Sequence, residues 1–319
     1  MSKLKDSTQG EFALIDKIKS LSAAVPEGVV GIGDDCAVLP QKDGIQSLVS
    51  CDLLVEGEHF ILDRIALRDL GWKSAAVNIS DIAAMGGKPT GTFLSLCLPD
   101  SLGEEDILEF IEGYNDLSSR FSCPLLGGDT TRGRLLCINV TVLGECPKGG
   151  AVLRSGARPG DLICVTGCLG DSATGLELIL SGSTSAPHYQ YLKARHYLPC
   201  PQVQQGMAIA KAGASAMMDI SDGVASDLRH ILKESSVGAE VDCKAIPMSA
   251  QMRQACEAAG LDPLEKALCG GEDYELLFTI GEQELQKLGI EHYVIGRINA
   301  SGTLAWKGSD RDYLGFRHF

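Results

Sequence analysis

The stretch that decides the fold is LRDLGWKSAAVNISDIAAM (Leu67–Met85), which predicts a long helix. Ser47–Val55 precedes it and Thr92–Leu98 follows it, and both segments are typical of β-strands. Asp81 lies near the C-terminal end of the helix, where a carboxylate opposes the helix dipole. A side chain placed against the local electrostatics is a candidate functional residue, although solvation at the surface would also explain it.

The same alternation of helices and strands continues along the chain and predicts mixed α and β structure. The segment Cys146–Gly160 is rich in Gly and Pro and separates two halves. With 319 residues the chain is long enough for roughly two domains, which we place at residues 1–148 and 149–319. The other predicted helices are Gly10–Leu21, Glu104–Ser119, Ser172–Leu180, Val203–Ala212, Val224–Lys233 and Ala250–Ala259, and the other predicted strands are Leu135–Glu145, Asp161–Thr166, Ala239–Cys243, Tyr274–Ile280 and Tyr293–Arg297.

Aspartates recur in small-residue segments that border apolar ones. Buried carboxylates are costly unless cations or hydrogen-bond donors meet them, and the chain has 28 Lys and Arg against 42 Asp and Glu. Mg²⁺ takes oxygen ligands and is usually held by a few carboxylates while it bridges substrate phosphates. The pattern therefore indicates Mg²⁺-dependent phosphate chemistry. The segments are GIGDDCAVL (Gly31–Leu39), SCDLLV (Ser50–Val55), NISD (Asn78–Asp81), LGGDTTRG (Leu126–Gly133), LGDSATG (Leu169–Gly175) and MDISDG (Met218–Gly223). The second and third fall within the predicted strand and the predicted long helix, and we interpret the others as loops or their borders.

The composition limits the possible partners and the compartment. A net charge of −14 argues against nucleic acid or an anionic membrane as a partner. It would also repel a phosphate ligand, unless bound metal ions reverse the local field. The 12 cysteines are scattered singly, which favours reduced thiols in a cytoplasmic protein over a zinc site or a disulfide framework. The N-terminus lacks the apolar core of a signal peptide, and no apolar run is long enough to span a bilayer.

The common phosphate-binding motifs are absent. The chain has no P-loop, no complete dinucleotide fingerprint and no protein-kinase motif. Each candidate residue also has an ordinary interpretation. Asp171 and Asp222 stand where helix N-caps belong, and Asp35 could be a turn residue. Arg154 and His59 could be solvated side chains. Several Asp-bearing segments flanked by Gly, Ser or Thr rarely arise as independent turns, so the combination favours a metal–phosphate site.

Seven motifs in order resemble the thiamine-monophosphate kinase family, and the resemblance runs from Gly10 to the end of the chain. More distantly, the chain resembles aminoimidazole-ribonucleotide synthetase, selenophosphate synthetase and the hydrogenase-maturation dehydratase. The motifs are GEFALI, GIGDDCAVL, NISDIAAMGGKP, GGDTTRG, VTGCLGDSATGL, DISDGVASDL and CGGEDYELLFT.

The resemblance implies an α/β (α+β) fold of the aminoimidazole-ribonucleotide-synthetase type in two domains, with N-terminal sheets that form a barrel in a homodimer. It also implies that ATP and several Mg²⁺ ions bind in the cleft between the domains. The chain departs from the family pattern at two positions. Cys51 replaces a Thr, and because a thiol is a poor ligand for a hard ion, Cys51 would bind Mg²⁺ only through its backbone carbonyl. Phe316 replaces a Tyr or Trp and loses a polar group. The implied metal ligands are Asp35, Ser50, Cys51, Asp52, Asp81, Asp129, Asp219 and Asp222; the implied ATP contacts are Gly128, Asp129, Arg154 and Ser221; the implied thiamine-phosphate contacts are His59, Glu272 and Phe316.

The expected reaction is direct in-line transfer of the γ-phosphoryl group from ATP to thiamine monophosphate, which gives thiamine diphosphate. A phosphate monoester has a second pKa of about 6 and is largely ionised at pH 7, so no general base is required. The difficulty is to bring two polyanions together, and clustered Mg²⁺ ions achieve this by neutralising charge. Two alternatives remain open: another ATP-dependent enzyme of the same superfamily with a different small acceptor, and a catalytically silent metal–nucleotide-binding protein.

Overall fold

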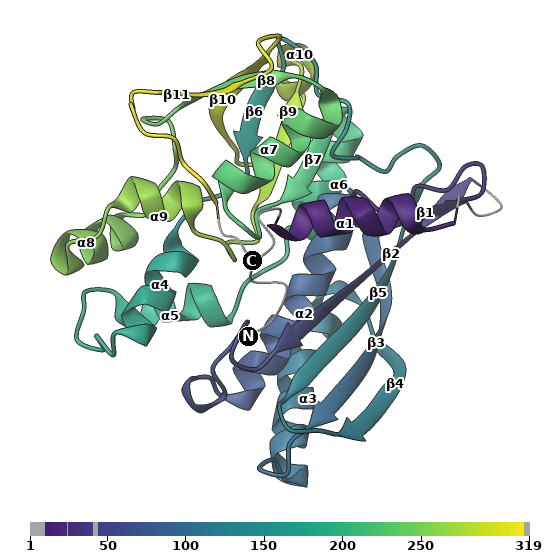
Figure 1. Cartoon of the computed structure of the whole chain (residues 1–319), viewed down its shortest axis with the longest axis vertical. Coiled ribbons are helices and arrows are strands. Elements are labelled where there is room, and N and C mark those ends of the chain that lie inside the picture. The colour runs from purple at the N-terminus through teal and green to yellow at the C-terminus, as the bar shows by residue number, and fades with distance from the viewer. Residues whose placement is uncertain (1–9, 24, 41–43, 316–319) are drawn as a thin grey trace.

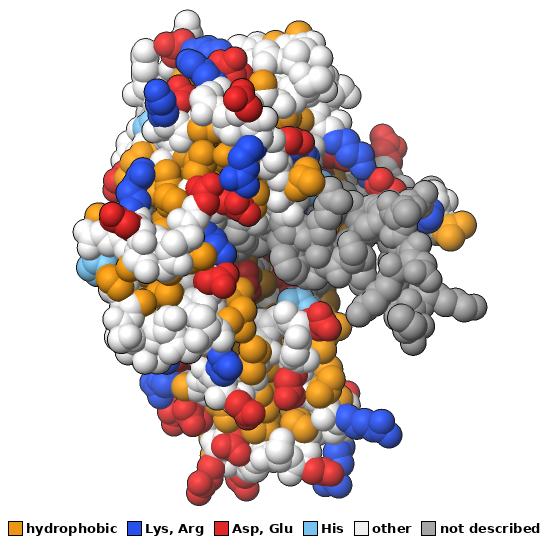
Figure 2. Space-filling view, turned by 60° about the vertical axis from the view of Figure 1, so that its left-hand side comes forward, with side chains coloured by type: hydrophobic (Ala, Val, Ile, Leu, Met, Phe, Trp, Pro, Cys, Tyr) orange, Lys and Arg blue, Asp and Glu red, His pale blue; other side chains and the backbone are white. Residues whose placement is uncertain are grey.

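The computed structural model describes residues 10–23, 25–40 and 44–315, with side chains from residue 15 onward. It contains two mixed β-sheets with helices around them (Figure 1). None of the described helices is both long enough and apolar enough to cross a membrane. On the face shown in Figure 2, acidic and basic side chains are interspersed and do not gather into one basic surface.

The first sheet has five strands in the order β1-β2-β5-β3-β4. Neighbouring strands are antiparallel except β3 and β4, which are parallel. The strands are β1 (Ala37–Pro40), β2 (Ile45–Val55), β3 (Lys88–Leu98), β4 (Leu125–Arg132) and β5 (Cys137–Pro147). The prediction that LGGDTTRG is a loop was wrong, because residues 125–132 form hydrogen bonds along β3. Gly128 allows this close pairing, since a Cβ there would lie 1.7 Å from the Leu94 carbonyl oxygen.

Helices α2 (Leu67–Ala84) and α3 (Glu104–Ser118) cover one face of this sheet (Figure 1). The predicted long helix is confirmed, and it ends one residue earlier than expected, with Met85 as its C-cap. The two helices cross closely at Gly71 and Gly113. A Cβ on Gly71 would lie 1.9 Å from the Phe110 carbonyl oxygen, and one on Gly113 would lie 1.8 Å from the Arg68 carbonyl oxygen. Because glycine has no Cβ, the backbones of the two helices can come into contact at these positions.

The second sheet has six strands in the order β11-β8-β10-β6-β9-β7. Only the pair β8 and β11 is parallel among its described strands. The strands are β6 (Leu162–Val165), β7 (Ala216–Asp219), β8 (Gly238–Asp242), β9 (Leu276–Ile280), β10 (Tyr293–Asn299) and β11 (Leu304–Lys307); the helices are α4 (Asp171–Leu180), α5 (Tyr189–Tyr197), α6 (Val203–Ala212), α7 (Val224–Ser235), α8 (Ala250–Ala259), α9 (Pro263–Cys269) and α10 (Glu282–Leu285). Helix α1 (Gly10–Leu21) precedes both sheets in sequence and is joined to α7 by an ion pair between Asp16 and Lys233.

Neither Asp171 nor Asp222 is a helix N-cap, so this ordinary interpretation of both residues was wrong. Gly170 caps α4 and Asp171 is its first helical residue, whereas Gly223 caps α7 and Asp222 precedes that cap. Both caps are glycines with positive φ, 84° and 98°. The chain therefore enters each helix through a conformation that Asp adopts less readily than Gly.

The two halves share a buried core in which α2 is the central element. Ile79 and Ile82 of α2 belong to the same hydrophobic cluster as Met217 and Phe278 of the second sheet. Helix α6 packs against α2 so closely that a Cβ on Gly206 would lie 2.1 Å from the Ala83 carbonyl oxygen. The C-terminal end of α2, and with it Asp81, is therefore held between the two sheets.

Candidate active site

A cleft of about 1530 Å³ is lined by both halves of the chain. The first half contributes β2, the segment 57–61 and α2, and the second half contributes α4, α7 and the segments that follow β7 and precede β9. The predicted site residues that line it are Asp35, Ser50, Asp52, His59, Asp81, Arg154, Asp219, Ser221, Asp222 and Glu272.

Three of the predicted metal ligands meet inside this cleft. Asp35 precedes β1, Asp81 lies in the last turn of α2 and Asp219 ends β7. Each offers a carboxylate oxygen, and these oxygens all lie within 4.8 Å of one another. Hydroxyl groups orient two of them: Ser50 Oγ donates to Asp81 and Ser80 Oγ donates to Asp219, each at 2.5 Å.

The cluster is electrostatically unfavourable unless a cation binds. Burial and, next, the charge of Asp35 raise the pKa of Asp219 to about 7 and that of Asp52 to about 6. The pKa of Asp81 is well above its ordinary value because of burial and the nearby Asp52, Asp219 and Asp35. The buried Oδ2 of Asp35 has no hydrogen-bond partner among the described residues. An oxygen-only donor set with an unused buried oxygen fits Mg²⁺.

Arg154 supplies a positive charge at the edge of the cluster. Its Nη2 lies 2.6 Å from Asp35 Oδ1, and its backbone N–H donates to Asp34 Oδ1 at 2.6 Å. Its buried Nε has no partner among the described residues. The guanidinium therefore keeps a donor available beside the carboxylates, which suits a bidentate contact with phosphate.

Strand alternation separates Cys51 from its neighbours. Ser50 and Asp52 line the cleft, whereas the Cys51 thiol lies on the opposite face of β2, where it accepts hydrogen bonds from Asn139 Nδ2 at 3.1 Å and Thr141 Oγ1 at 3.4 Å. The thiol of Cys51 points away from the carboxylate cluster. Coordination of a metal by the backbone carbonyl of Cys51 stays a prediction.

Gly128 and Asp129 lie apart from the carboxylate cluster. Both belong to β4 at the edge of the first sheet, where they are exposed. Asp129 pairs with Ser95, which pairs with Asn139, and Asn139 pairs with Leu53. Directly paired residues point to the same face of a sheet, so Asp129 lies on the face opposite to Ser50 and Asp52. Asp129 therefore lies outside the cleft of its own chain, and its predicted roles in metal and ATP binding stay predictions.

Two of the three predicted substrate contacts line the cleft. His59 Nδ1 accepts a hydrogen bond from the Val55 backbone N–H at 3.1 Å, which leaves the proton of the neutral ring on Nε2. Glu272 has a φ of +63°, which is uncommon for a residue with a side chain and often marks functional sites. Phe316 lies outside the described residues.

The sequence analysis missed two residues that contact Glu272, Lys73 and His196, and a third, Ser172, that contacts His196. Lys73 Nζ lies 2.8 Å from Glu272 Oε1, and His196 Nδ1 lies 3.3 Å from Glu272 Oε2. Ser172 Oγ lies 3.0 Å from the same Nδ1. In a Ser–His–acid triad the serine and the acid contact opposite ring nitrogens, so this group is not a nucleophilic triad. Only Lys73 gave a sequence signal, as a charge within the apolar part of the long helix.

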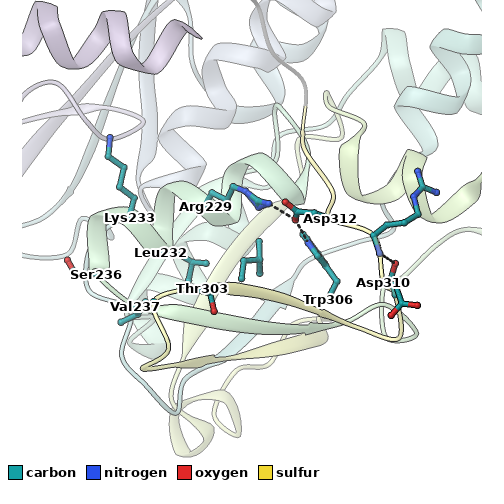
Figure 3. A pocket seen from close by; sticks show the side chains of 13 residues that line it. Arg229, Leu232, Lys233, Ser236, Val237, Thr303, Trp306, Asp310 and Asp312 are labelled. Carbon is teal, nitrogen blue, oxygen red and sulfur yellow. Dashed lines mark hydrogen bonds and ion pairs between the residues drawn. The ribbon is translucent and has the colours of Figure 1, made fainter. Parts of the chain in front are cut away.

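A second pocket lies at α7 and β11 (Figure 3). Its cations are engaged in ion pairs: Arg229 with Asp312 at 2.7 Å, Lys233 with Asp16 at 2.9 Å, and Arg311 with Glu265 at 2.7 Å. Trp306 Nε1 also donates to Asp312 at 3.1 Å. These groups satisfy one another, and we assign no ligand to this pocket.

Comparison with known proteins places the chain in a class. Residues 33–146 match the family described as AIR synthase related protein, N-terminal domain, and residues 158–307 match its C-terminal domain. The thiamine-monophosphate kinase of Escherichia coli K12 is 40% identical over 328 residues, which cover 94% of this chain and 98% of that protein. The thiamine-monophosphate kinase of Bacillus subtilis is 39% identical and covers 87% of this chain and 86% of its own.

Solved structures agree with these relatives. One described as AaThiL complexed with AMPPCP and TMP superposes with a TM-score of 0.90 at 35% identity and covers 100% of this chain and 99% of that one. The thiamine-monophosphate kinase of Stenotrophomonas maltophilia has a TM-score of 0.78 at 37% identity, covering 94% of this chain and 98% of its own. The chain belongs to the thiamine-monophosphate kinases within the AIR synthase related family. The expected two-domain α/β fold of that family is confirmed.

Proposed function

We propose that the protein phosphorylates thiamine monophosphate with ATP and releases thiamine diphosphate and ADP. The observation that carries this proposal is the convergence of Asp35, Asp81 and Asp219 with Arg154 in a cleft that also contains Glu272. Carboxylates at this spacing suit a metal-assisted phosphoryl transfer, and the relatives of the chain are thiamine-monophosphate kinases.

Two groups of residues that line the cleft would divide the work of binding. Asp35, Asp81 and Asp219, with Asp52 and Asp222 beside them, would hold Mg²⁺ ions, which neutralise the charge that develops on the transferred phosphoryl group when bound. Arg154 would clamp the triphosphate. Glu272 and His59 would position the thiamine moiety. No side chain is assigned as a general base, because the acceptor phosphate is already ionised at pH 7.

We also propose that the protein is a homodimer, joined through the outer face of the first sheet, which carries Leu53, Phe93 and Asp129. Leu53 is 52% exposed and Phe93 is 43% exposed, and exposed apolar side chains on a sheet face favour burial against a partner. A barrel built from two such sheets would cover this face.

Reduced cysteines are consistent with a cytoplasmic enzyme.

Measurement of ADP release with and without thiamine monophosphate tests the proposed activity. We expect release that depends on both thiamine monophosphate and Mg²⁺. Release that occurs without thiamine monophosphate would point to another acceptor, and ATP binding without release under either condition would point to a silent binding protein.

A further inference from the structure

Lys73 is a buried cation whose charge is directed at Glu272. Its side chain is 1% exposed in the middle of α2, and its Nζ lies 2.8 Å from Glu272 Oε1. An ammonium group taken out of water is strongly destabilising unless a carboxylate meets it. Packing of α2 alone does not require a cation here, since the small residues Ser74, Ala75 and Ala76 fill the neighbouring buried positions.

His196 meets the other oxygen of the same carboxylate. The residue is 4% exposed, and its Nδ1 lies 3.3 Å from Glu272 Oε2. Burial and the nearby Lys73 lower the pKa of His196 to about 4, so the ring is neutral at pH 7. The same Nδ1 lies 3.0 Å from Ser172 Oγ. A proton on Nδ1 of the neutral ring avoids a contact between two acceptors at Glu272 Oε2, and Ser172 Oγ and Glu272 Oε2 then both lie next to this N–H.

The backbone also holds Glu272 in one place. Its N–H donates to the Ser221 carbonyl oxygen at 2.8 Å, and Tyr274 N–H donates to the Ile220 carbonyl oxygen at 3.0 Å. These bonds extend the pairing of β7 and β9 and tie Glu272 to the segment that follows Asp219. Gly271 permits the close approach, since a Cβ there would lie 2.1 Å from the Ser221 carbonyl oxygen. The side chain of Glu272 remains 27% exposed, and it lines the cleft.

We infer that Lys73 and His196 are positioning residues that turn Glu272 into an oriented hydrogen-bond acceptor for the acceptor substrate. Each lies against one carboxylate oxygen, and the partly exposed carboxylate lines the cleft. Because Lys73 already neutralises the carboxylate, Glu272 does not act mainly by attracting a cation. It instead recognises a neutral N–H donor, which on thiamine monophosphate is the exocyclic amine of the aminopyrimidine. This inference rests on the proposed function.

Substitution of Lys73 separates the two ways in which Glu272 could act. If Glu272 attracted the cationic ring by its charge, Lys73→Met would unmask that charge and lower the KM for thiamine monophosphate. If Lys73 orients Glu272, the same variant raises that KM by about tenfold or more, the usual range for a hydrogen bond to a charged group, and leaves the KM for ATP within about twofold. Lys307→Met, an exposed residue paired with Asp242 on β8, is the matched control and leaves both KM values unchanged.

A double-mutant cycle and a conservative variant distinguish positioning from general packing. In a Glu272→Gln background, Lys73→Met should add little further increase in KM, because its effect passes through Glu272. His196→Asn keeps a side-chain N–H near Nδ1 and should stay closer to the wild type than His196→Ala, which should raise the KM for thiamine monophosphate by about two- to tenfold. The His196 pair keeps the test decisive if Lys73→Met does not fold.

The outcomes distinguish failure of this inference from failure of the proposed function. Wild-type protein that releases no ADP in response to thiamine monophosphate would overturn the proposed function and the inference with it. If the wild type turns over, any one of three results would overturn the inference alone. The first is a lowered KM for thiamine monophosphate in Lys73→Met, and the second is full additivity of the effects of Lys73→Met and Glu272→Gln. The third is an equal KM for thiamine monophosphate in His196→Asn and His196→Ala.

Discussion

Replacement of Asp219 by Asn should stabilise the metal-free protein at pH 7 and weaken its stabilisation by Mg²⁺. Asp219 is 3% exposed, and burial together with the charge of Asp35 raises its pKa from 3.8 to about 7. The folded state must therefore either protonate this group or keep it charged at a cost. A difference of about 3 pKa units at 1.36 kcal/mol each amounts to about 4 kcal/mol at pH 7. The neutral, isosteric Asn avoids that cost and can still accept the hydrogen bond from Ser80 Oγ.

The expected gain depends on pH in a defined direction. The folded pKa of Asp219 exceeds its value of 3.8 in the unfolded chain, so the folded state binds more protons between about pH 4 and pH 7. Metal-free wild-type protein should lose stability as the pH rises through this window. Asp219→Asn should lose less, so that its advantage of up to about 4 kcal/mol at pH 7 is nearly absent at pH 4.

The assay is urea unfolding followed by circular dichroism, with EDTA at pH 4.5, 6 and 7.5 and again with Mg²⁺ and ATP. Asp310→Asn, at an exposed position after β11, is the matched control and should leave the midpoint unchanged. A lower midpoint for metal-free Asp219→Asn at pH 7.5, or a gain of equal size at pH 4.5, would refute the electrostatic account of the cluster. An undiminished effect of Mg²⁺ and ATP on the variant would remove Asp219 from the metal site.

Four further substitutions, at three positions, test the site and the fold. Asp129 lies outside the cleft of its own chain, so its predicted role as a metal ligand requires the proposed dimer; on that arrangement Asp129→Asn should abolish turnover while the circular dichroism spectrum stays that of the wild type, because it removes charge without changing volume, and near-normal kinase activity would exclude Asp129 from the metal ligands. Cys51→Thr and Cys51→Ala should both retain activity, since the thiol points away from the cleft; a large loss of kcat in either would reveal a role for this thiol. Gly71→Ala should lower the free energy of unfolding by about 1–3 kcal/mol, since its Cβ would lie 1.9 Å from the Phe110 carbonyl oxygen; an unchanged urea midpoint would show that α2 and α3 can separate at no cost.

Much of the carboxylate cluster could be predicted from the sequence because each member sits in a recognisable segment of small residues next to an apolar one. The same signal also marked Asp129, which the structure places on the outer face of the first sheet. A local pattern of Gly and Asp indicates that a segment can approach a ligand closely. It does not indicate to which face of a sheet the Asp side chain points. For Cys51 the period of two along a strand would have sufficed, since Ser50 and Asp52 must face away from it.

The residues around Glu272 could not be found in this way. Lys73, Ser172 and His196 lie in three different helices and have no shared spacing in the sequence. Their relation to Glu272 arises only where α2 of the first half meets α4 and α5 of the second. The positive φ of Glu272 likewise occurs where its N–H donates to Ser221 of another segment.

The sequence by itself determined the alternation of helices and strands, the long helix that ends near Asp81, and the identity of the acidic segments, because periodicity and local composition act over a few residues. The tertiary structure decided which of those acidic groups meet. Asp35, Asp81 and Asp219 come within 4.8 Å because α2 is packed between two sheets. That packing depends on contacts such as Gly206 against Ala83, between residues more than a hundred positions apart, and no local pattern carries that information.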